Sequence, residues 1–175
     1  MNIRIASIAA HQTWSLRHRI MWPHKSIDYV KVPEDENGLH YGLYKDNNIV
    51  SVVSLFITTP CSDRSSNNDS IAEAQFRKFC TETSEQGNGY GSMLLQHMFD
   101  ELRKQEYSPQ QENVVVDRVW CNARIDKTGF YKKFNMKETN ETFERGGQEY
   151  VIMETQLLQP SNDDSNNGKK NEELN

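Results

Sequence analysis

The stretch that decides the fold is Gln86-Gly87-Asn88-Gly89-Tyr90-Gly91, a glycine-rich turn between two more regular segments. Residues 76–81 before it predict a strand, and the amphipathic segment that begins at Ser92 predicts a helix. Glycine lacks a Cβ atom and permits positive φ angles, so the backbone of such a turn can approach a ligand closely. The first N–H groups of a helix have no intrahelical partner. A strand, a glycine turn and a helix in this order therefore predict an anion-binding turn.

The spacing of the glycines limits which anion-binding motif this is. Gly87 and Gly89 begin a G-x-G-x-x-G dinucleotide fingerprint, but Ser92 stands at its last position, and the turn carries no Gly-Lys-Ser/Thr of a P-loop. A glycine-rich loop without a ligand is the alternative. The helix after the turn is expected to bury one face, because its apolar residues recur at helical spacing. These residues are Met93, Leu94, Leu95, Met98, Phe99 and Leu102.

A second segment carries a family resemblance. It comprises Asn122-Ala123-Arg124 and Phe130-Tyr131-Lys132-Lys133-Phe134-Asn135-Met136. Together, the turn and this segment resemble the Gln/Arg-x-x-Gly-x-Gly/Ala signature and the later N-A-R…F-Y-x-K-L-G-F segment of the GNAT acetyltransferases. Residues 143–153 look like the closing hairpin of the same family. The chain departs from the family pattern at Lys127, where alanine is usual, at Asn135, where glycine is usual, and at Glu149, where histidine is frequent.

The resemblance implies an α/β (α+β) GNAT acyl-CoA N-acyltransferase fold. This fold has a central mixed, mostly antiparallel sheet of six to seven strands, with splayed parallel strands four and five and helices on both faces. We expect strands at 2–5, 39–44, 49–57, 71–81 and 114–122, a hairpin at 137–157, and helices at 9–21, 89–105 and 126–134. Residues 1–158 form the predicted acetyltransferase domain. Residues 159–175 are a polar tail expected to be disordered.

Acetyl-CoA is the co-substrate that the resemblance implies. In GNAT proteins the pantetheine lies between strands four and five and pairs with the backbone of strand four, and the pyrophosphate lies on the turn. The implied cofactor-binding residues are Phe79, Cys80, Thr81, Gln86, Gly87, Asn88, Gly89, Tyr90, Gly91 and Ser92, with Asn122 and Arg124 positioning the pantetheine or the substrate.

Two residues are catalytic candidates. Tyr131 matches the family tyrosine that reaches the thioester sulfur, and its hydroxyl, with an ordinary pKa of about 10, suits protonation of the departing thiolate. The alternative is an aromatic ring that only packs. Gln75 stands where the histone acetyltransferase branch has a glutamate base, and Glu73, on the same face of the strand, is the substitute candidate. A water chain in place of a dedicated base is the other hypothesis.

The predicted activity is that of an N-acetyltransferase that moves an acetyl group to a primary amine by direct transfer in a ternary complex. A small-molecule amine is favoured, because the chain has no evident docking module. A protein lysine or N-terminal acetyltransferase and a non-catalytic acyl-CoA-binding regulatory module are the alternatives. The residues on offer for acceptor binding are Arg17, Arg19, Trp22, His24, His40, Glu149 and Tyr150.

Composition agrees with one intracellular domain. The chain has 175 residues, 35% hydrophobic content and a formal net charge of −5, which disfavours a nucleic-acid surface. Three scattered cysteines and five histidines give no metal pattern and indicate a reducing compartment, cytoplasmic or nuclear. The N-terminal region has no continuous apolar stretch, so we expect neither a signal peptide nor a membrane span. A homodimer stays open.

Overall fold

A seven-stranded mixed sheet with the strand order β1-β2-β3-β4-β5-β7-β6 forms the centre of the computed structural model, which describes residues 1–58, 70–104 and 114–157. The strands are β1 (Ile3–Ser7), β2 (Leu39–Lys45), β3 (Asn48–Thr58), β4 (Ser70–Thr81), β5 (Val114–Arg124), β6 (Lys137–Arg145) and β7 (Gln148–Gln156). The helices are α1 (Ala10–Met21), α2 (Tyr90–Lys104) and α3 (Thr128–Tyr131). Short 3-10 segments are η1 (Ile27–Val30), η2 (Pro33–Asn37), η3 (Thr83–Glu85), η4 (Ile125–Lys127) and η5 (Lys132–Phe134).

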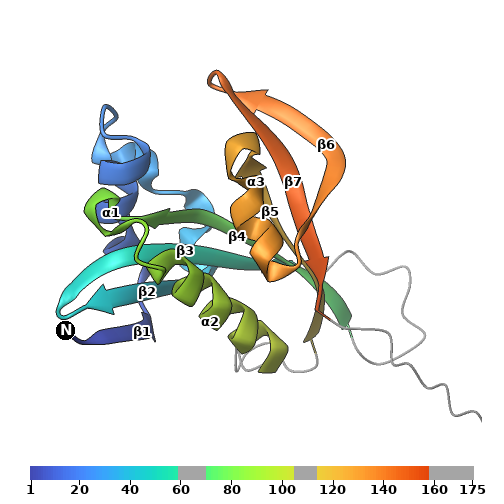
Figure 1. The fold of residues 1–175 in the computed structure, drawn as a ribbon, viewed down its shortest axis with the longest axis horizontal. Coiled ribbons are helices and arrows are strands. Elements are labelled where there is room, and N and C mark those ends of the chain that lie inside the picture. Colours follow the sequence, from blue (N-terminus) through green and yellow to red (C-terminus); the bar gives the residue numbers. More distant parts are fainter. Residues whose placement is uncertain (59–69, 105–113, 158–175) are drawn as a thin grey trace, which may run out of the picture.

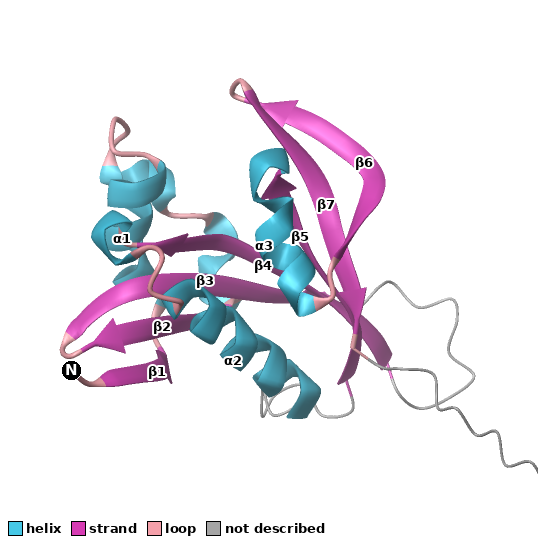
Figure 2. Cartoon of the chain, viewed as in Figure 1, coloured by secondary structure: helices cyan, strands magenta, loops and turns pink. Residues whose placement is uncertain are grey.

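The helices lie on both faces of the sheet (Figure 2). On β3, Val53 packs in the larger core with α2, whereas its neighbour Val52 packs with Leu16 of α1. Successive residues of a strand point to opposite faces, so α2 and α1 cover opposite faces. The amphipathic pattern of α2 predicted this packing, and all of its apolar residues except Met93 are buried.

Every pair of adjacent strands is antiparallel except β4 and β5, which are parallel. Their pairing ends at Gln75 and Trp120, although β4 continues to Thr81 and β5 to Arg124. Figure 1 shows β5, β7 and β6 rising away from the direction of β1–β4. The predicted fold class is therefore confirmed, including the splayed parallel pair.

The predicted elements differ from the observed ones mainly at their ends. Strand five runs to Arg124, two residues past its expected end, and the expected helix at 126–134 is divided into η4, α3 and η5. The tail expected to be disordered at 159–175 lies outside the described residues. No helix among those described has the length and apolarity that a membrane crossing needs.

A buried ion pair joins α1 to η2. The guanidinium of Arg17, fully buried, donates to both carboxylate oxygens of Asp35 over 2.6 and 3.0 Å, and to Ser54 of β3. Burial alone would raise the pKa of Asp35, but the hydrogen bond and charge of Arg17 outweigh it and hold this pKa below its ordinary value. The pair therefore stays ionised within the fold.

His40 completes this network as a neutral imidazole. Its Nε2 lies 2.8 Å from the carbonyl oxygen of Asp35, so Nε2 carries a proton and donates. Its Nδ1 lies 2.7 Å from the Ser54 hydroxyl, which already accepts from Arg17 and can donate its own proton to Nδ1. Burial also lowers the pKa of His40. Both ring nitrogens of His40 are thus satisfied within the fold, and the ring is a structural group rather than an acceptor-binding one.

We predict that Asp35→Asn lowers the free energy of unfolding by about 3–5 kcal/mol, because it leaves the Arg17 guanidinium buried without a counter-charge. Asp28→Asn is the matched control, since Asp28 pairs with Lys31 over 2.6 Å on the surface. That change should cost less than about 1 kcal/mol. Urea unfolding at neutral pH measures both, and equal losses for the two variants would contradict the assignment.

Candidate active site

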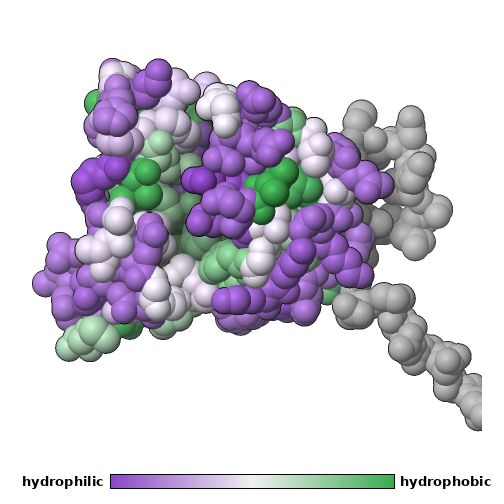
Figure 3. Space-filling view, turned by 45° about the horizontal axis from the view of Figure 1, so that its top comes forward, coloured by the Kyte–Doolittle hydropathy of each residue, from purple (hydrophilic) through white to green (hydrophobic). Residues whose placement is uncertain are grey.

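The opening between β4 and β5 forms a cleft of about 680 Å³. Its walls are the end of α1, the part of β4 that no longer pairs with β5, the glycine turn, the end of β5, α3, and Tyr150 of β7. Figure 3 shows the surface hollowed between the half that carries α1 and the half that carries β6 and β7, with hydrophilic residues along the rims. The cleft therefore follows directly from the interrupted strand pairing.

Unpartnered backbone donors lie at the glycine turn. No backbone N–H from Gly87 to Ser92 has a hydrogen-bond partner among the described residues, and the first helical bond runs from the N–H of Met93 to the carbonyl of Gly89 over 2.9 Å. Gly87 and Gly89 have φ angles of 85° and 81°, which only glycine adopts at little cost. The turn thus presents a row of donors that an anion can accept from.

Gly91 is required for a different reason, close packing. A Cβ atom there would lie 3.1 Å from Cζ of Phe79 and 3.2 Å from Oγ1 of Thr81. A residue with a side chain at this position would require Phe79 or Thr81 to shift by a few tenths of an ångström. The glycine therefore fixes the distance between the turn and the strand edge.

Tyr131 lies on the α3 wall of the cleft beside Cys121 of β5. Burial, and secondarily Cys121, raises the pKa of the Tyr131 hydroxyl well above its ordinary value. Burial likewise raises the pKa of the Cys121 thiol. Both groups are thus protonated at neutral pH, the tyrosine as a hydrogen-bond donor and the cysteine as a weakly nucleophilic thiol.

A family model described as "Acetyltransferase (GNAT) domain" matches residues 21–157. The chain belongs to the GNAT acetyltransferase family. An uncharacterised N-acetyltransferase of Bacillus subtilis, YitI, is 30% identical over 150 residues, which span 83% of this chain and 89% of the relative. As a GNAT protein with such a relative, the chain is an N-acetyltransferase, an enzyme of the acyltransferase class.

Solved structures agree with the fold. A putative N-acetyltransferase from Lactobacillus plantarum superposes with a TM-score of 0.67 at 17% identity, covering 90% of this chain and all of that one. NAA60 of Arabidopsis thaliana, solved in complex with acetyl-CoA, superposes with a TM-score of 0.65 at 9% identity, covering 89% and 98% of the two chains. At these identities the similarity shows the GNAT fold alone.

The cleft brings together nearly all of the cofactor-binding residues predicted for this GNAT chain. Its lining includes Phe79, Cys80, Thr81, Gln86, Gly87, Gly89, Tyr90, Gly91, Ser92, Asn122 and Arg124. Asn88 does not line it, because its side-chain amide donates to the carbonyl of Glu85 over 3.2 Å. Gln86 orders the turn, since its Nε2 donates to the carbonyl of Thr81 over 3.1 Å.

Several residues that line the cleft have side chains that point elsewhere, so they contribute their backbone atoms to it. The side chain of Cys80 packs with Leu16 of α1 on the far face of β4, and that of Tyr90 is buried against Met1. Arg124 forms an ion pair with Asp126 over 3.0 Å while lining the cleft. Asn135 has φ 59°, a left-handed conformation, which accounts for the glycine usual there in the family.

Glu73 lies outside the cleft. Its carboxylate pairs with Arg118 of β5 over 3.0 Å, and the same guanidinium pairs with Glu154 of β7 over 2.6 Å. Gln75, on the same strand face, is buried and accepts from Nε of Arg77 over 2.6 Å. The position of Glu73 therefore does not support a role as general base.

The acceptor-binding candidates divide into two groups. Trp22 and Tyr150 line the cleft. The others lie elsewhere: Arg17 and His40 are in the buried network, Arg19 pairs with Glu82 over 2.7 Å, and His24 and Glu149 are exposed outside the lining. Arg77 and Lys78 line the cleft and were not among the sequence candidates.

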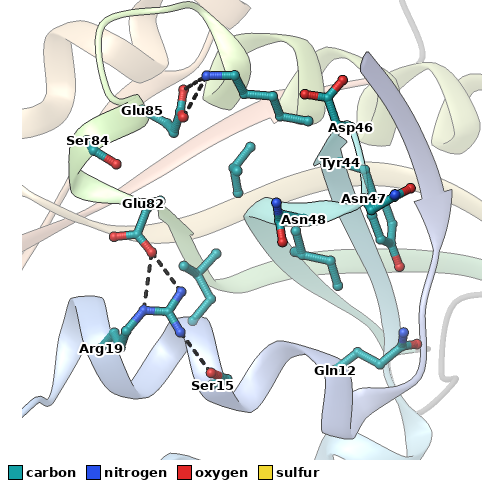
Figure 4. A pocket seen from close by; sticks show the side chains of 14 residues that line it. Gln12, Ser15, Arg19, Tyr44, Asp46, Asn47, Asn48, Glu82, Ser84 and Glu85 are labelled. Carbon is teal, nitrogen blue, oxygen red and sulfur yellow. Dashed lines mark hydrogen bonds and ion pairs between the residues drawn. The ribbon is translucent and has the colours of Figure 1, made fainter. Parts of the chain in front are cut away.

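A second cavity, of about 670 Å³, lies between α1, the β2–β3 turn and η3 (Figure 4). Two ion pairs cross its rim: Arg19 of α1 with Glu82 over 2.7 Å, and Lys45 of β2 with Glu85 over 2.7 Å. Glu82 precedes η3 and Glu85 is its last residue, directly before the glycine turn. The pairs thus tie the support of the turn to both α1 and β2. No predicted cofactor-binding or catalytic residue lines this cavity.

Proposed function

We propose that the protein transfers an acetyl group from acetyl-CoA to a primary amine by direct attack in a ternary complex. The observation that carries the proposal is the cleft between β4 and β5, which ends on a turn of unpartnered N–H groups from Gly87 to Ser92. We place a small-molecule amine first as the acceptor. Protein lysines and N-terminal amines are included in the assays that test it.

The cleft suits the three parts of acetyl-CoA. The N–H groups of the turn suit a pyrophosphate, and the β5-facing edge of β4 beyond Gln75 offers unpaired backbone groups to the amides of the pantetheine. Lys133 on the opposite wall adds positive charge for phosphate, whereas Lys127 beside it is paired with Asp126 over 3.4 Å. NAA60, a solved structure of the same fold, was determined with acetyl-CoA, which agrees with this assignment.

Direct transfer without an acyl-enzyme fits the protonated state of the cysteine thiols that line the cleft. The amine nitrogen forms the C–N bond, the C–S bond breaks, the nitrogen loses a proton and the CoA sulfur gains one. The cysteines nearest the cleft are poor nucleophiles for an acyl-enzyme step, because burial raises the pKa of Cys80 to about 12 and that of Cys121 further. No enzyme nucleophile is therefore needed.

Tyr131 stabilises the leaving sulfur in this proposal. A thiol has a pKa of about 8.5, and burial holds the Tyr131 pKa above the usual value of about 10. Full proton transfer from the tyrosine is thus uphill, whereas a hydrogen bond from its hydroxyl to the developing thiolate is favourable. The proton reaches the sulfur finally from water.

A dedicated carboxylate base is not part of the proposal. Among the described lining residues only Glu85 has a carboxylate, and it is paired with Lys45. The amine proton is therefore passed to water, and the acceptor must enter the site partly neutral. An experiment on the cofactor and one on the tyrosine test the two halves of the proposal.

We predict that Gly89→Ala weakens acetyl-CoA binding by roughly tenfold or more, because a Cβ would stand where the pyrophosphate approaches the backbone. Gly147→Ala in the β6–β7 turn is the matched control. Both glycines have positive φ, 81° and 76°, and neither Cβ would meet an atom within 4 Å. Both variants carry similar backbone strain of about 1 kcal/mol, so only the ligand distinguishes them. Calorimetry giving equal affinities for the two variants would contradict the site.

We predict that Tyr131→Phe lowers turnover by roughly 10²–10⁴-fold, nearer the lower limit because a thiolate leaves fairly well, with little change in acetyl-CoA affinity. The substitution removes the hydroxyl and keeps the ring that packs against Phe76 and Phe130. Tyr41→Phe, at a buried core tyrosine on β2, is the control. Release of free CoA is measured with polyamines, amino acids, aminoglycosides and lysine peptides, and an unchanged rate in Tyr131→Phe would refute the role.

A further inference from the structure

A β-bulge in β4 directs the side chain of Lys78 toward the end of α1, on one wall of the cleft. Ser54 pairs with Arg77 and Val52 with Cys80, so Lys78 and Phe79 together oppose Val53. Lys78 has φ 54°, which is uncommon and strained for a residue with a side chain. Bulges of this kind re-aim side chains next to active sites.

The bulge brings the cationic side chains of Arg77 and Lys78 to the same face of β4. Phe76 and Phe79 point to the α2 and α3 face, where they contact Phe99 and Phe130. Strict alternation would send Lys78 to that face as well. Instead its ammonium lies 4.3 Å from the ring centroid of Trp22, at the end of α1. Arg77 also points to the α1 face, so the bulge places two cations next to each other.

Neither cation is neutralised. The Arg77 guanidinium contacts the Phe56 ring at 4.8 Å and donates to the Gln75 amide, and the Lys78 ammonium lies 4.3 Å from the centroid of the Trp22 ring. Neither has a carboxylate partner among the described residues, whereas Arg17, behind them, is paired with Asp35. Two unpaired cations that line a cleft leave a place for an anionic group of the ligand.

The positive potential at this point is strong. Burial lowers the pKa of Lys78, and Arg17, Arg145 and Arg77 lower it further, outweighing the opposing effect of Asp35. Arg145 is the last residue of β6, so the β6–β7 hairpin also contributes a positive charge that acts on Lys78. An anion bound here would relieve this repulsion as well as form its own contacts.

We propose that the acetyl acceptor carries a carboxylate beside its amine, as an amino acid does, and that Arg77 and Lys78 bind this carboxylate. The proposal rests on the proposed acetyltransferase activity and names its substrate class. Arg77 offers a planar fork for two carboxylate oxygens, and Lys78 offers a single charge. Polyamines and aminoglycosides, which are polycations, are repelled from the same place.

The cationic pair also explains how an amine becomes reactive in a cleft without a free carboxylate. Nearby positive charge disfavours an ammonium ion, so the pKa of the bound acceptor amine falls and more of it is the neutral nucleophile. The carboxylate offsets the repulsion in the bound complex and thereby keeps the amine at the site. Specificity and activation of the amine then come from the same two residues.

The test compares each common L-amino acid with its own carboxamide in the CoA-release assay. We expect a kcat/KM for the best acid roughly 10–100-fold above that of its amide, the range for a lost hydrogen bond to a charged group. The amide has the less basic amine, so a preference for the acid does not arise from amine ionisation. Lys78→Met and Arg77→Met should each remove most of this preference through KM, and Lys137→Met, at an exposed residue of β6 outside the cleft, should preserve it.

The outcomes separate the two proposals. Polyamines, peptides or carboxamides turned over faster than every acid would overturn the carboxylate site and leave the acetyltransferase activity intact. If no amine is acetylated, calorimetry that compares the binding affinities of N-acetyl-amino acids and their methylamides tests the carboxylate site. A carboxylate site binds the acids more tightly than the methylamides, and Lys78→Met removes this difference. Equal affinities for acid and methylamide in the wild type would overturn the carboxylate site. Unimpaired acetyl-CoA binding by both variants establishes that they fold.

Discussion

The structure depends on the interrupted pairing of β4 and β5. These parallel strands share hydrogen bonds up to Gln75 and Trp120 and then separate while remaining paired to β3 and β7. Buried backbone groups without partners are costly, so a gap within a sheet persists only when something supports it. Aromatic side chains on one side provide support: Phe79 stacks on Phe130 at 5.7 Å, and Phe76 contacts Tyr131 at 5.9 Å. These contacts hold the short α3 region against β4 at the gap.

The glycine turn at the end of the gap is supported from the opposite side. A single exposed ion pair contributes little to stability. Here the partly buried Lys45–Glu85 pair and the more exposed Arg19–Glu82 pair act together: they connect the last residue of η3 to β2 and the residue before η3 to α1. Close packing of Gly91 on Phe79 and Thr81 fixes its other end. Donors aimed in advance at a ligand need little reorganisation when it binds, and this anchoring provides that arrangement.

Features with local signals were predictable from the sequence, and features that arise from tertiary contacts were not. The glycine turn, the apolar face of α2 and the β2 and β3 strands each have a pattern that one segment determines, and the resemblance supplied the mixed sheet with its splayed parallel strands four and five. Glu73 was chosen by strand alternation from Gln75, but alternation cannot report that Arg118 of β5 and Glu154 of β7 converge on that carboxylate. Arg17 was expected to contact the acceptor, and only the folded chain shows that it is buried and paired with Asp35.

The bulge at Lys78 is the clearest case of a missed signal. Alternation places this residue on the wrong face, and no glycine marks its positive φ. The basic pair between Phe76 and Phe79 was the one available hint, because two adjacent cations in a regular strand would put one of them in the core. The chain resolves this conflict by bulging, which directs both toward the cleft.

Net charge was a poor guide to the site. The whole chain carries −5, yet the charged residues that line the cleft are basic except for Glu85, which Lys45 neutralises. A cleft lined by positive charges within a negatively charged surface focuses the electric field and attracts anionic ligands. Acetyl-CoA is anionic, and so is the carboxylate of the proposed acceptor. The glycine turn and the α3 wall attract acetyl-CoA, and the cations at the bulge attract the acceptor. One positive potential would therefore draw both reactants into the gap between β4 and β5.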